Sequence, residues 1–168
     1  NTNLKWINSE EIEGKVDGRS QKLEEMFEGI CGLIVPQGWG SRGVEGKIVA
    51  IKYARENNVP YLGLCFGMQM AVIEFARNVF GLKNANSEEA DPKTLYPVIH
   101  VMPDQAKYLA KKQYGGTIRL GQWPTKIAAS SKQLGTSYRK YKEFCKGYFD
   151  GKIIQERHRH RYEVNTKY

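Results

Sequence analysis

The sequence predicts an α/β protein with a mostly parallel central sheet that has helices on both faces. Two observations lead to this class. Short apolar runs bounded by turn residues alternate with longer stretches of helical spacing, which is typical of βαβ units. The chain also has 168 residues, of which 40% are hydrophobic, and this is enough for one domain with a sizeable core.

The expected strands are four apolar runs, at residues 4–7, 30–36, 61–64 and 97–102. The expected helices lie between them, at residues 21–27, 45–56 and 67–80. The last helix is the best marked, because its apolar side chains recur on one stripe that we expect to face the core: Met68, Val72, Phe75 and Val79. Glu74 and Arg77 fall outside this stripe.

After the third helix the pattern changes. Residues 81–94 predict a loop, residues 115–129 a hairpin or an extended arm, and residues 137–146 a helix. The segment "ERHRHRYEVN", at residues 156–165, predicts a strand with Arg157, Arg159 and Arg161 on one face and His158, His160 and Tyr162 on the other. These arginines either pair with a carboxylate or phosphate, or form an exposed basic strand.

The net charge of +8 is unevenly distributed along the chain. Residues 107–168 hold 15 Lys and Arg against 4 Asp and Glu, whereas residues 1–106 hold 11 against 14. Such an excess favours an anionic partner, although a solvated basic face explains it equally well. No RNA-recognition, KH or zinc-finger pattern is present, so we expect no nucleic-acid partner.

The cysteine pattern and the hydropathy of the chain indicate the cellular compartment in which we expect the protein. Cys31, Cys65 and Cys145 are widely separated and lack metal-ligand spacing with histidine, so we expect neither a disulfide scaffold nor a metal site. No apolar stretch reaches the roughly 20 residues that span a bilayer, and no leader opens the chain. A cytoplasmic protein without a membrane partner is expected.

The stretch "PYLGLCFGMQ", at residues 60–69, carries the strongest chemical signal, since Cys65 lies between Gly63 and Gly67. A sharp strand-to-helix turn leaves no room for side chains two positions to either side. It also exposes the thiol beside a helix N-terminus that favours the thiolate. The alternative is a buried thiol packed in a tight corner, but the preceding strand and following helix favour a nucleophile.

A second glycine-rich turn, "VPQGWGSRGVEGK" at residues 35–47, follows an expected strand. In a parallel sheet it lies at the same edge as Cys65, where its amides would face a developing oxyanion; an ordinary βα loop is the alternative. Among possible bases, His100 is expected to be an ordinary strand histidine. His158 and His160 remain, and the sequence places neither beside Cys65.

Several segments together resemble a known family. "GLCFGMQ" resembles the nucleophile elbow of triad-type class I glutamine amidotransferases, and "RGVEGK", "NANSEE", "GGTIRLG" and "RHRHRYEVN" resemble the glutaminase domain of the CTP synthase family. The resemblance covers most of the chain, so residues 1–168 are expected to form one glutaminase domain with a flavodoxin-like fold. It implies hydrolysis of L-glutamine and transfer of the ammonia to a synthetase domain, which aminates UTP to CTP with ATP and Mg²⁺.

The resemblance also implies residue roles. Cys65 attacks the side-chain amide to form a glutamyl thioester, and the amides of Phe66, Gln37 and Gly38 stabilise the oxyanion. The substrate-binding residues implied are Gly38, Phe66, Gly67, Met68, Gln69, Glu89 and Arg161. Glu89 would pair with the substrate ammonium and Arg161 with its carboxylate. Arg119 lies in a loop that resembles the region responding to GTP, the allosteric activator. No cofactor is expected in this domain, and the full enzyme is expected to be a homotetramer.

The chain also departs from the family. Gln37 stands where the family has glycine, and it would be strained if that position needs a positive φ. The family's base and orienting carboxylate lie in a histidine-proline-glutamate segment, and the 168 residues include neither that segment, nor the first strand, nor the synthetase domain. We therefore expect this chain alone to hydrolyse glutamine poorly. The alternative function is a non-catalytic α/β module that contacts an anionic partner through its basic second half.

Overall fold

The computed structural model describes residues 2–14, 20–112, 118–126 and 153–168 of the chain. The chain falls into two compact units, which are described separately. The first unit comprises Asn1–Ala106 and Tyr162–Tyr168, and the second comprises Lys107–Arg161. The helix expected at residues 137–146 lies outside the described residues, as does Cys145.

The helices of the first unit are α1 (Ser9–Glu13), α2 (Ser20–Phe27), α3 (Val44–Glu56) and α4 (Phe66–Asn78). A further helix, α5 (Pro103–Ala110), begins in the first unit and ends in the second. The helices expected at residues 21–27, 45–56 and 67–80 are confirmed as α2, α3 and α4. The spacing of apolar residues does not predict α1 or α5.

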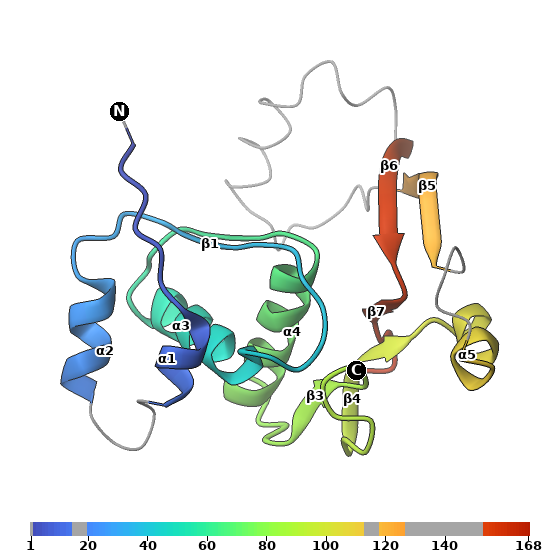
Figure 1. Cartoon of the computed structure of the whole chain (residues 1–168), viewed down its shortest axis with the longest axis horizontal. Coiled ribbons are helices and arrows are strands. Elements are labelled where there is room, and N and C mark those ends of the chain that lie inside the picture. The colour runs from blue at the N-terminus through green and yellow to red at the C-terminus, as the bar shows by residue number, and fades with distance from the viewer. Residues whose placement is uncertain (1, 15–19, 113–117, 127–152) are drawn as a thin grey trace. The chain divides into compact units, whose positions relative to one another are not determined.

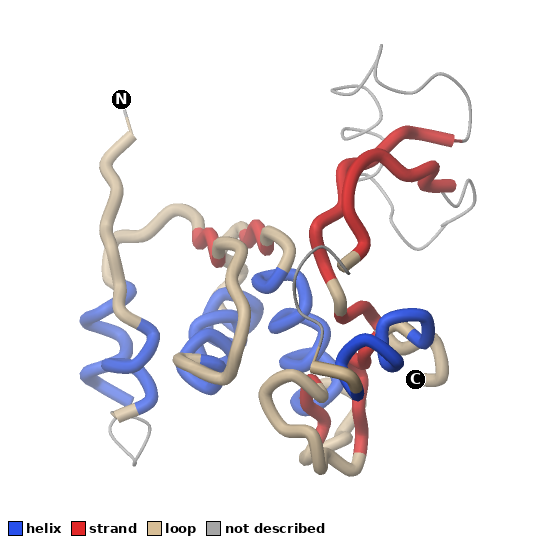
Figure 2. The backbone as a smooth tube through the Cα atoms, turned by 45° about the vertical axis from the view of Figure 1, so that its right-hand side comes forward, coloured by secondary structure: helices blue, strands red, loops and turns tan. Residues whose placement is uncertain are grey.

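Two sheets belong to the first unit. β1 (Leu33–Val35) and β2 (Tyr61–Gly63) pair in parallel, with Val35 opposite Gly63, and Figure 2 shows these two strands side by side. β3 (Ala85–Ser87) pairs in parallel with β4 (Tyr96–Val101), which also pairs antiparallel with β7 (Tyr162–Val164). The parallel pair β1 and β2, which is connected through α3, confirms the α/β class.

Three of the four expected strands are confirmed, and the one at residues 4–7 is wrong. Residues 2–8 form no element, and the side chains of Leu4 and Trp6 are 74% and 89% exposed. An extended segment is stable as a strand only where a neighbour accepts and donates its backbone hydrogen bonds. Apolar composition at residues 4–7 does not supply that neighbour.

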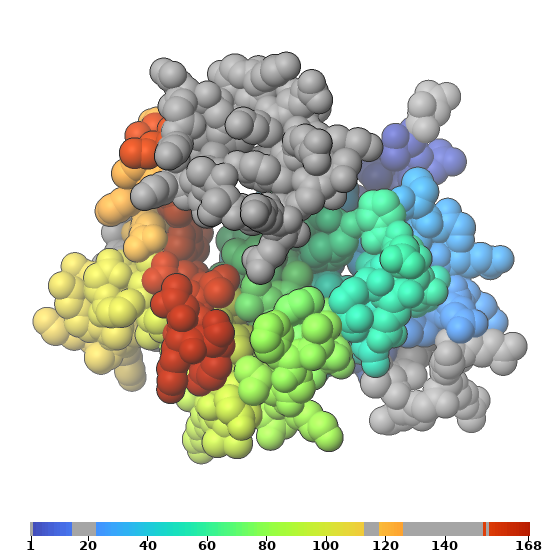
Figure 3. Space-filling view, turned by 180° about the vertical axis from the view of Figure 1, so that it is seen from behind, coloured from blue at the N-terminus to red at the C-terminus, as the bar shows by residue number. Residues whose placement is uncertain are grey.

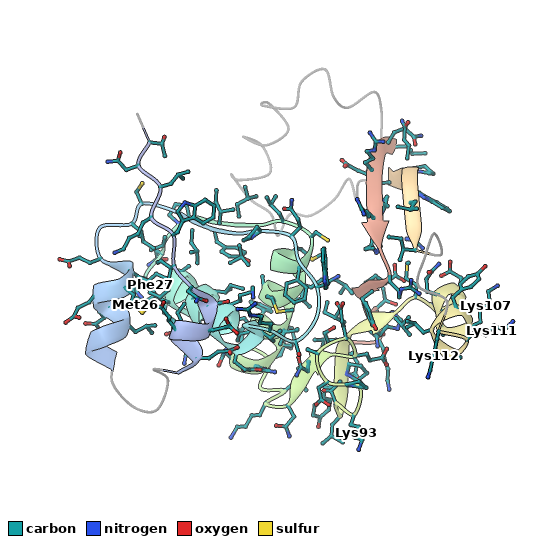
Figure 4. The ribbon with its side chains drawn as sticks, in the orientation of Figure 1. Met26, Phe27, Lys93, Lys107, Lys111 and Lys112 are labelled. Atoms are coloured by element: carbon teal, nitrogen blue, oxygen red, sulfur yellow. The ribbon has the colours of Figure 1, made fainter. Side chains whose placement is uncertain are left out.

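The core of the first unit lies where α3 and α4 pack against β1 and β2 (Figure 1). Its largest fully buried members include Phe66, Met70 and Ile73 from α4 and Ile99 from β4. A second cluster joins Ile12, Phe27 and Ala50, and the rings of Phe27 and Tyr53 stack with centroids 4.6 Å apart. Figure 4 labels Phe27 where α2 faces α3.

α1 crosses α3 at very short range. A Cβ on Gly46 would overlap the backbone of Ser9, so only glycine fits at this crossing. Figure 3 shows the turquoise surface of α3 from behind, beside the lighter blue surface of the region around α2. The carboxylate of Glu13 caps the start of α3 by accepting hydrogen bonds from the amides of Glu45 and Gly46, at 2.9 and 3.3 Å.

The stripe expected to face the core from α4 is confirmed for Val72, which packs against the core, and is wrong for its other three residues. Met68, Phe75 and Val79 are 42%, 46% and 49% exposed, whereas Glu74 is 1% exposed. Glu74 is buried because the guanidinium of Arg55 on α3 holds its carboxylate, with Nη2 2.9 Å from Oε1. A charged side chain is stable in the interior when it is paired in this way.

The second unit contains an antiparallel pair, β5 (Arg119–Lys126) and β6 (Ile153–His160). It confirms the extended structure expected around residues 115–129. The rings of His158 and His160 share one face, as the alternation predicts, with Nδ1 and Nε2 2.7 Å apart. β6 ends at His160, so Arg161 lies beyond the strand.

No helix among the described residues combines the length and the apolar character needed to cross a membrane.

Candidate active site

Cys65 stands on a sharp turn between β2 and α4. Its backbone has φ +52° and ψ −101°, and its side chain is exposed. A residue with a Cβ reaches a positive φ only at a cost of about 1–3 kcal/mol, and such strained residues cluster at functional sites. The structure therefore has the strand-to-helix geometry expected of a nucleophile elbow. The reactivity of Cys65 stays a prediction.

Two glycines make this turn possible. A Cβ on Gly63 would lie 2.7 Å from the backbone of Gly67 and Met68, and one on Gly67 would overlap the carbonyl oxygen of Val35. The close approach of β1, β2 and α4 thus requires glycine at both positions, which is the reason that the sequence suggested.

Four hydrogen bonds fix the turn. Leu64 donates its amide to the oxygen of Val35 at 3.0 Å, Gly67 to Leu64 at 3.0 Å, and Gln69 to Cys65 at 3.1 Å. The fourth comes from a side chain, because the Tyr61 hydroxyl donates to the carbonyl oxygen of Gly67 at 2.7 Å. Burial raises the pKa of Tyr61, so this hydroxyl stays protonated.

The glycine-rich loop after β1 contacts the elbow. Because β1 and β2 are parallel neighbours, the loop and Cys65 leave the sheet at the same edge. A Cβ on Gly38 would lie 3.6 Å from the ring of Phe66, the first residue of α4. Among described residues other than glycine, positive φ occurs at Asn58, Cys65 and Lys112, so Gln37 avoids the strain considered from the sequence.

Glu89 anchors the same loop from a distant part of the sequence. Its Oε1 accepts a hydrogen bond from the amide of Gly40 at 3.1 Å, and Gly40 has φ +80°. The amide of Glu89 donates in turn to the hydroxyl of Ser87, which is fully buried. A carboxylate is thereby held beside the loop that is expected to stabilise the oxyanion.

Gln69 extends the site along α4. The side chain is 5% exposed, and its Nε2 donates to the carbonyl oxygen of Tyr162 at 3.2 Å. Its Oε1 is buried and has no hydrogen-bond partner among the described residues. An unsatisfied buried acceptor is uncommon in folded proteins and is often explained by a ligand or water.

The two predicted arginines belong to the second unit. Arg119 begins β5, and its guanidinium carbon lies 5.3 Å from the centroid of the Trp123 ring. Arg161 is the last residue of that unit. The pairing of Glu89 and Arg161 around one substrate therefore stays a prediction, whereas Cys65, Phe66, Gly38 and Glu89 are brought together within the first unit.

Tyr61 is a residue that the sequence reasoning missed. The signal was available, because a tyrosine in a short apolar strand must find a hydrogen-bond partner for its hydroxyl when it is buried. Tyr61 precedes Cys65 by four residues, on the strand that leads into the turn.

Comparisons with known proteins agree with this geometry. Residues 7–168 match the family described as Glutamine amidotransferase class-I, and the chain belongs to that family. It is 50% identical over 166 residues to the CTP synthase of Caldanaerobacter subterraneus subsp. tengcongensis and 47% identical over 165 residues to that of Pyrococcus horikoshii. These alignments cover 99% and 98% of this chain but 27% of each relative.

A solved structure gives the same result. The chain matches "Trypanosoma brucei CTPS - glutaminase domain with bound acivicin" with a TM-score of 0.75 and 37% identity, over 99% of this chain and 56% of the other. Within its family, the chain is thus a relative of the glutaminase domain of CTP synthases, and it spans about a quarter of the length of the relatives named above. The family and the fold class expected from the sequence are confirmed.

Proposed function

We propose that the chain hydrolyses L-glutamine through Cys65 and supplies ammonia for the ATP-dependent amination of UTP to CTP. The observation that carries this proposal is the strained, exposed Cys65 on its glycine-bracketed turn, next to a glycine-rich loop in contact with Phe66. Membership of the class I glutamine amidotransferase family supports the same chemistry.

The proposed reaction has two steps. The thiolate of Cys65 adds to the side-chain amide carbon, and the carbonyl oxygen becomes an oxyanion that the amides of Phe66, Gln37 and Gly38 stabilise. Collapse breaks the C–N bond, and the nitrogen leaves as ammonia with the proton that a general base first took from the Cys65 thiol. Water then cleaves the thioester, which releases glutamate and restores the thiol.

A site that binds a free amino acid needs an anionic side chain for its ammonium group and a cationic side chain, held apart from the first, for its carboxylate. Glu89 is proposed to take the ammonium, since its carboxylate already lies beside the loop through Gly40. Arg161 is proposed to take the carboxylate. Gly67, Met68 and Gln69 line the pocket in this proposal, and the buried Oε1 of Gln69 supplies a hydrogen-bond acceptor.

The wider enzyme is also part of the proposal. ATP and Mg²⁺ act in the synthetase domain of the full-length protein, a homotetramer in the cytoplasm. GTP would act through the β5–β6 pair, where Arg119 beside Trp123 combines a cation with an aromatic ring. A guanine base and a phosphate group take partners of these two kinds.

The test uses the full-length protein and a glutamine analogue with an electrophilic carbon. We expect mass addition at Cys65 by peptide mapping, together with glutamine-dependent CTP formation. The Cys65→Ala variant should lose both while it keeps CTP formation from added ammonium salt. An unlabelled Cys65 in the folded protein would argue against the pocket.

The second candidate is a non-catalytic module that binds an anionic partner. The charge distribution favours it, since residues 107–168 hold 15 basic against 4 acidic residues. Under this alternative, Cys65→Ala would leave every ligand-dependent signal intact, whereas substitution of the exposed Arg157 and Arg159 would abolish it.

A further inference from the structure

The strain at Cys65 must be opposed by contacts around the turn. A non-glycine residue at φ +52° relaxes unless its neighbours over-determine its conformation. Three of the four hydrogen bonds at the turn are between backbone groups. The remaining one is the bond from the Tyr61 hydroxyl to the oxygen of Gly67, and it is the one that a side-chain substitution can remove without altering the backbone.

Tyr61 fits this position closely. Its hydroxyl lies 2.8 Å from the point that a Cβ on Gly63 would occupy, so the absence of a side chain at Gly63 leaves the space for it. The ring packs against the main core of the first unit. Burial raises the pKa of Tyr61, so the hydroxyl remains a donor at neutral pH.

The acceptor of this bond lies in the first turn of α4. Gly67 follows Phe66, whose amide is proposed to stabilise the oxyanion, and Phe66 follows Cys65. The Tyr61 hydroxyl on β2 bonds the Gly67 carbonyl and so restrains the backbone of residues 65–67. The orientation of this backbone sets the direction of the Cys65 thiol and of the Phe66 amide. A misplacement of reacting groups by about 1 Å is enough to slow an enzyme strongly.

We propose that Tyr61 is a positioning residue for Cys65, which acts by locking the first turn of α4 onto β2. The hydroxyl bonds the Gly67 carbonyl and touches no substrate atom in this role. The proposal rests on the proposed glutaminase function and adds a residue to it.

The test is Tyr61→Phe in the full-length protein, which removes only the hydroxyl oxygen. We expect kcat for glutamine, normalised to Cys65 sites titrated by the electrophilic analogue, to fall about fivefold to tenfold, as loss of one part-buried hydrogen bond would produce. KM should change by less than about twofold, because the hydroxyl does not contact glutamine. p-Aminophenylalanine at position 61 keeps a donor and should restore most of kcat.

The matched control is Tyr53→Phe, which removes a hydroxyl from a tyrosine in the second core cluster. It should leave kcat and KM unchanged. Equal kcat in wild type and Tyr61→Phe would overturn the proposal, as would a p-aminophenylalanine variant no faster than Tyr61→Phe. Both phenylalanine variants are compared by thermal melting, so that a general loss of stability is recognised.

A second readout separates this proposal from the proposed function. The rate of Cys65 alkylation by iodoacetamide needs no glutamine site, and we expect it also to differ between wild type and Tyr61→Phe. If the wild type hydrolyses no glutamine but its alkylation rate depends on Tyr61, the function is wrong and the positioning role stands. If glutamine is hydrolysed and kcat is equal in wild type and Tyr61→Phe, the positioning role is wrong, whatever the alkylation rate.

Discussion

At the scale of single residues, the turn at Cys65 depends on the absence of a Cβ atom at its two flanking glycines. Gly67 lies against the carbonyl of Val35 so closely that a methyl group has no space. Gly14, at the end of α1, is a useful contrast, because a Cβ there would make an ordinary contact 3.7 Å from the oxygen of Glu10. The two positions allow the steric argument to be tested.

We predict that Gly67→Ala destabilises the fold by about 2–3 kcal/mol, since either α4 or β1 must shift. Gly14→Ala should change the free energy of unfolding by less than about 1 kcal/mol. Urea unfolding of both variants measures the difference. Equal effects of the two substitutions would show that the turn is looser than the structure indicates.

Glu89 supports a prediction about kinetics. Glu89→Gln keeps an oxygen that accepts from the Gly40 amide but loses the negative charge that we propose to pair with the substrate ammonium. We expect KM for glutamine to rise roughly 10-fold to 100-fold with a smaller change in kcat. Glu89→Ala removes the anchor as well, so kcat should fall further. Identical kinetics in the two variants would mean that the contact with Gly40 has no catalytic consequence.

Tyr61 also predicts a pH dependence of stability. Its folded-state pKa is raised by burial, so above about pH 10 the unfolded chain loses this proton while the folded chain keeps it. The stability that depends on the neutral hydroxyl is fully present below pH 10 and decreases as the pH rises further. Urea unfolding between pH 9 and 11.5 should show a steeper loss in wild type than in Tyr61→Phe. Parallel curves would contradict this.

At the scale of elements, α3 and α4 are joined by a charge pair inside the core. Glu74 is almost completely buried, whereas Arg55 reaches solvent with 35% of its side chain exposed. Asn78 adds a hydrogen bond to Glu74 Oε1 at 3.1 Å. The pair therefore lies in the contact between α3 and α4, beside the buried apolar residues of α4.

We predict that Arg55→Met destabilises the protein by about 2–4 kcal/mol, because it leaves a buried carboxylate without its cation. The exposed pair of Arg42 and Glu10 is the control, and Arg42→Met should leave the urea midpoint nearly unchanged. The double substitution of Arg55→Met with Glu74→Leu should recover much of the loss. A mild effect of Arg55→Met alone would show that water reaches Glu74.

This pair also explains how far the elements could be predicted. Apolar spacing identified α2, α3 and α4 and three of the strands, because their side chains pack in the core that such spacing implies. Apolar spacing predicted the wrong inward side of α4. It counts Glu74 as exposed because it does not include the ion pair with Arg55 that allows Glu74 to be buried. It also overlooked α1, which is short and is started by the side chain of Asn8 accepting from the Glu10 amide at 3.0 Å.

At the scale of the whole molecule, the site is drawn from segments far apart in the sequence. The thiol, the loop and Glu89 could be named from motifs, because each lies in a short distinctive segment. Their contact through Gly40 and Phe66 depends on tertiary packing, which no local pattern contains. The pairing of Glu89 and Arg161 with one substrate stays a prediction, because the two residues belong to different units.

A polypeptide of these 168 residues provides a further test. Its sequence has three histidines but not the histidine-proline-glutamate segment that holds the base of the family. Two of the histidines, His158 and His160, contact each other, with ring nitrogens 2.7 Å apart. We predict glutamine turnover at least 100-fold below that of the full-length protein, which is the usual contribution of a general base. Labelling of Cys65 by the electrophilic analogue should persist. Turnover equal to that of the full-length protein would show that the chain holds its own base.

The bond between Glu89 and the Gly40 amide has a consequence for substrate choice. If Glu89 receives the substrate ammonium, the same carboxylate also holds, through Gly40, the glycine-rich loop that is proposed to stabilise the oxyanion at the other end of the substrate. Binding energy gained far from the scissile bond would then be expressed in the transition state. A glutamine analogue without its α-amino group should therefore be turned over slowly even when it saturates the enzyme. The amino group of glutamine would then raise kcat as well as lower KM.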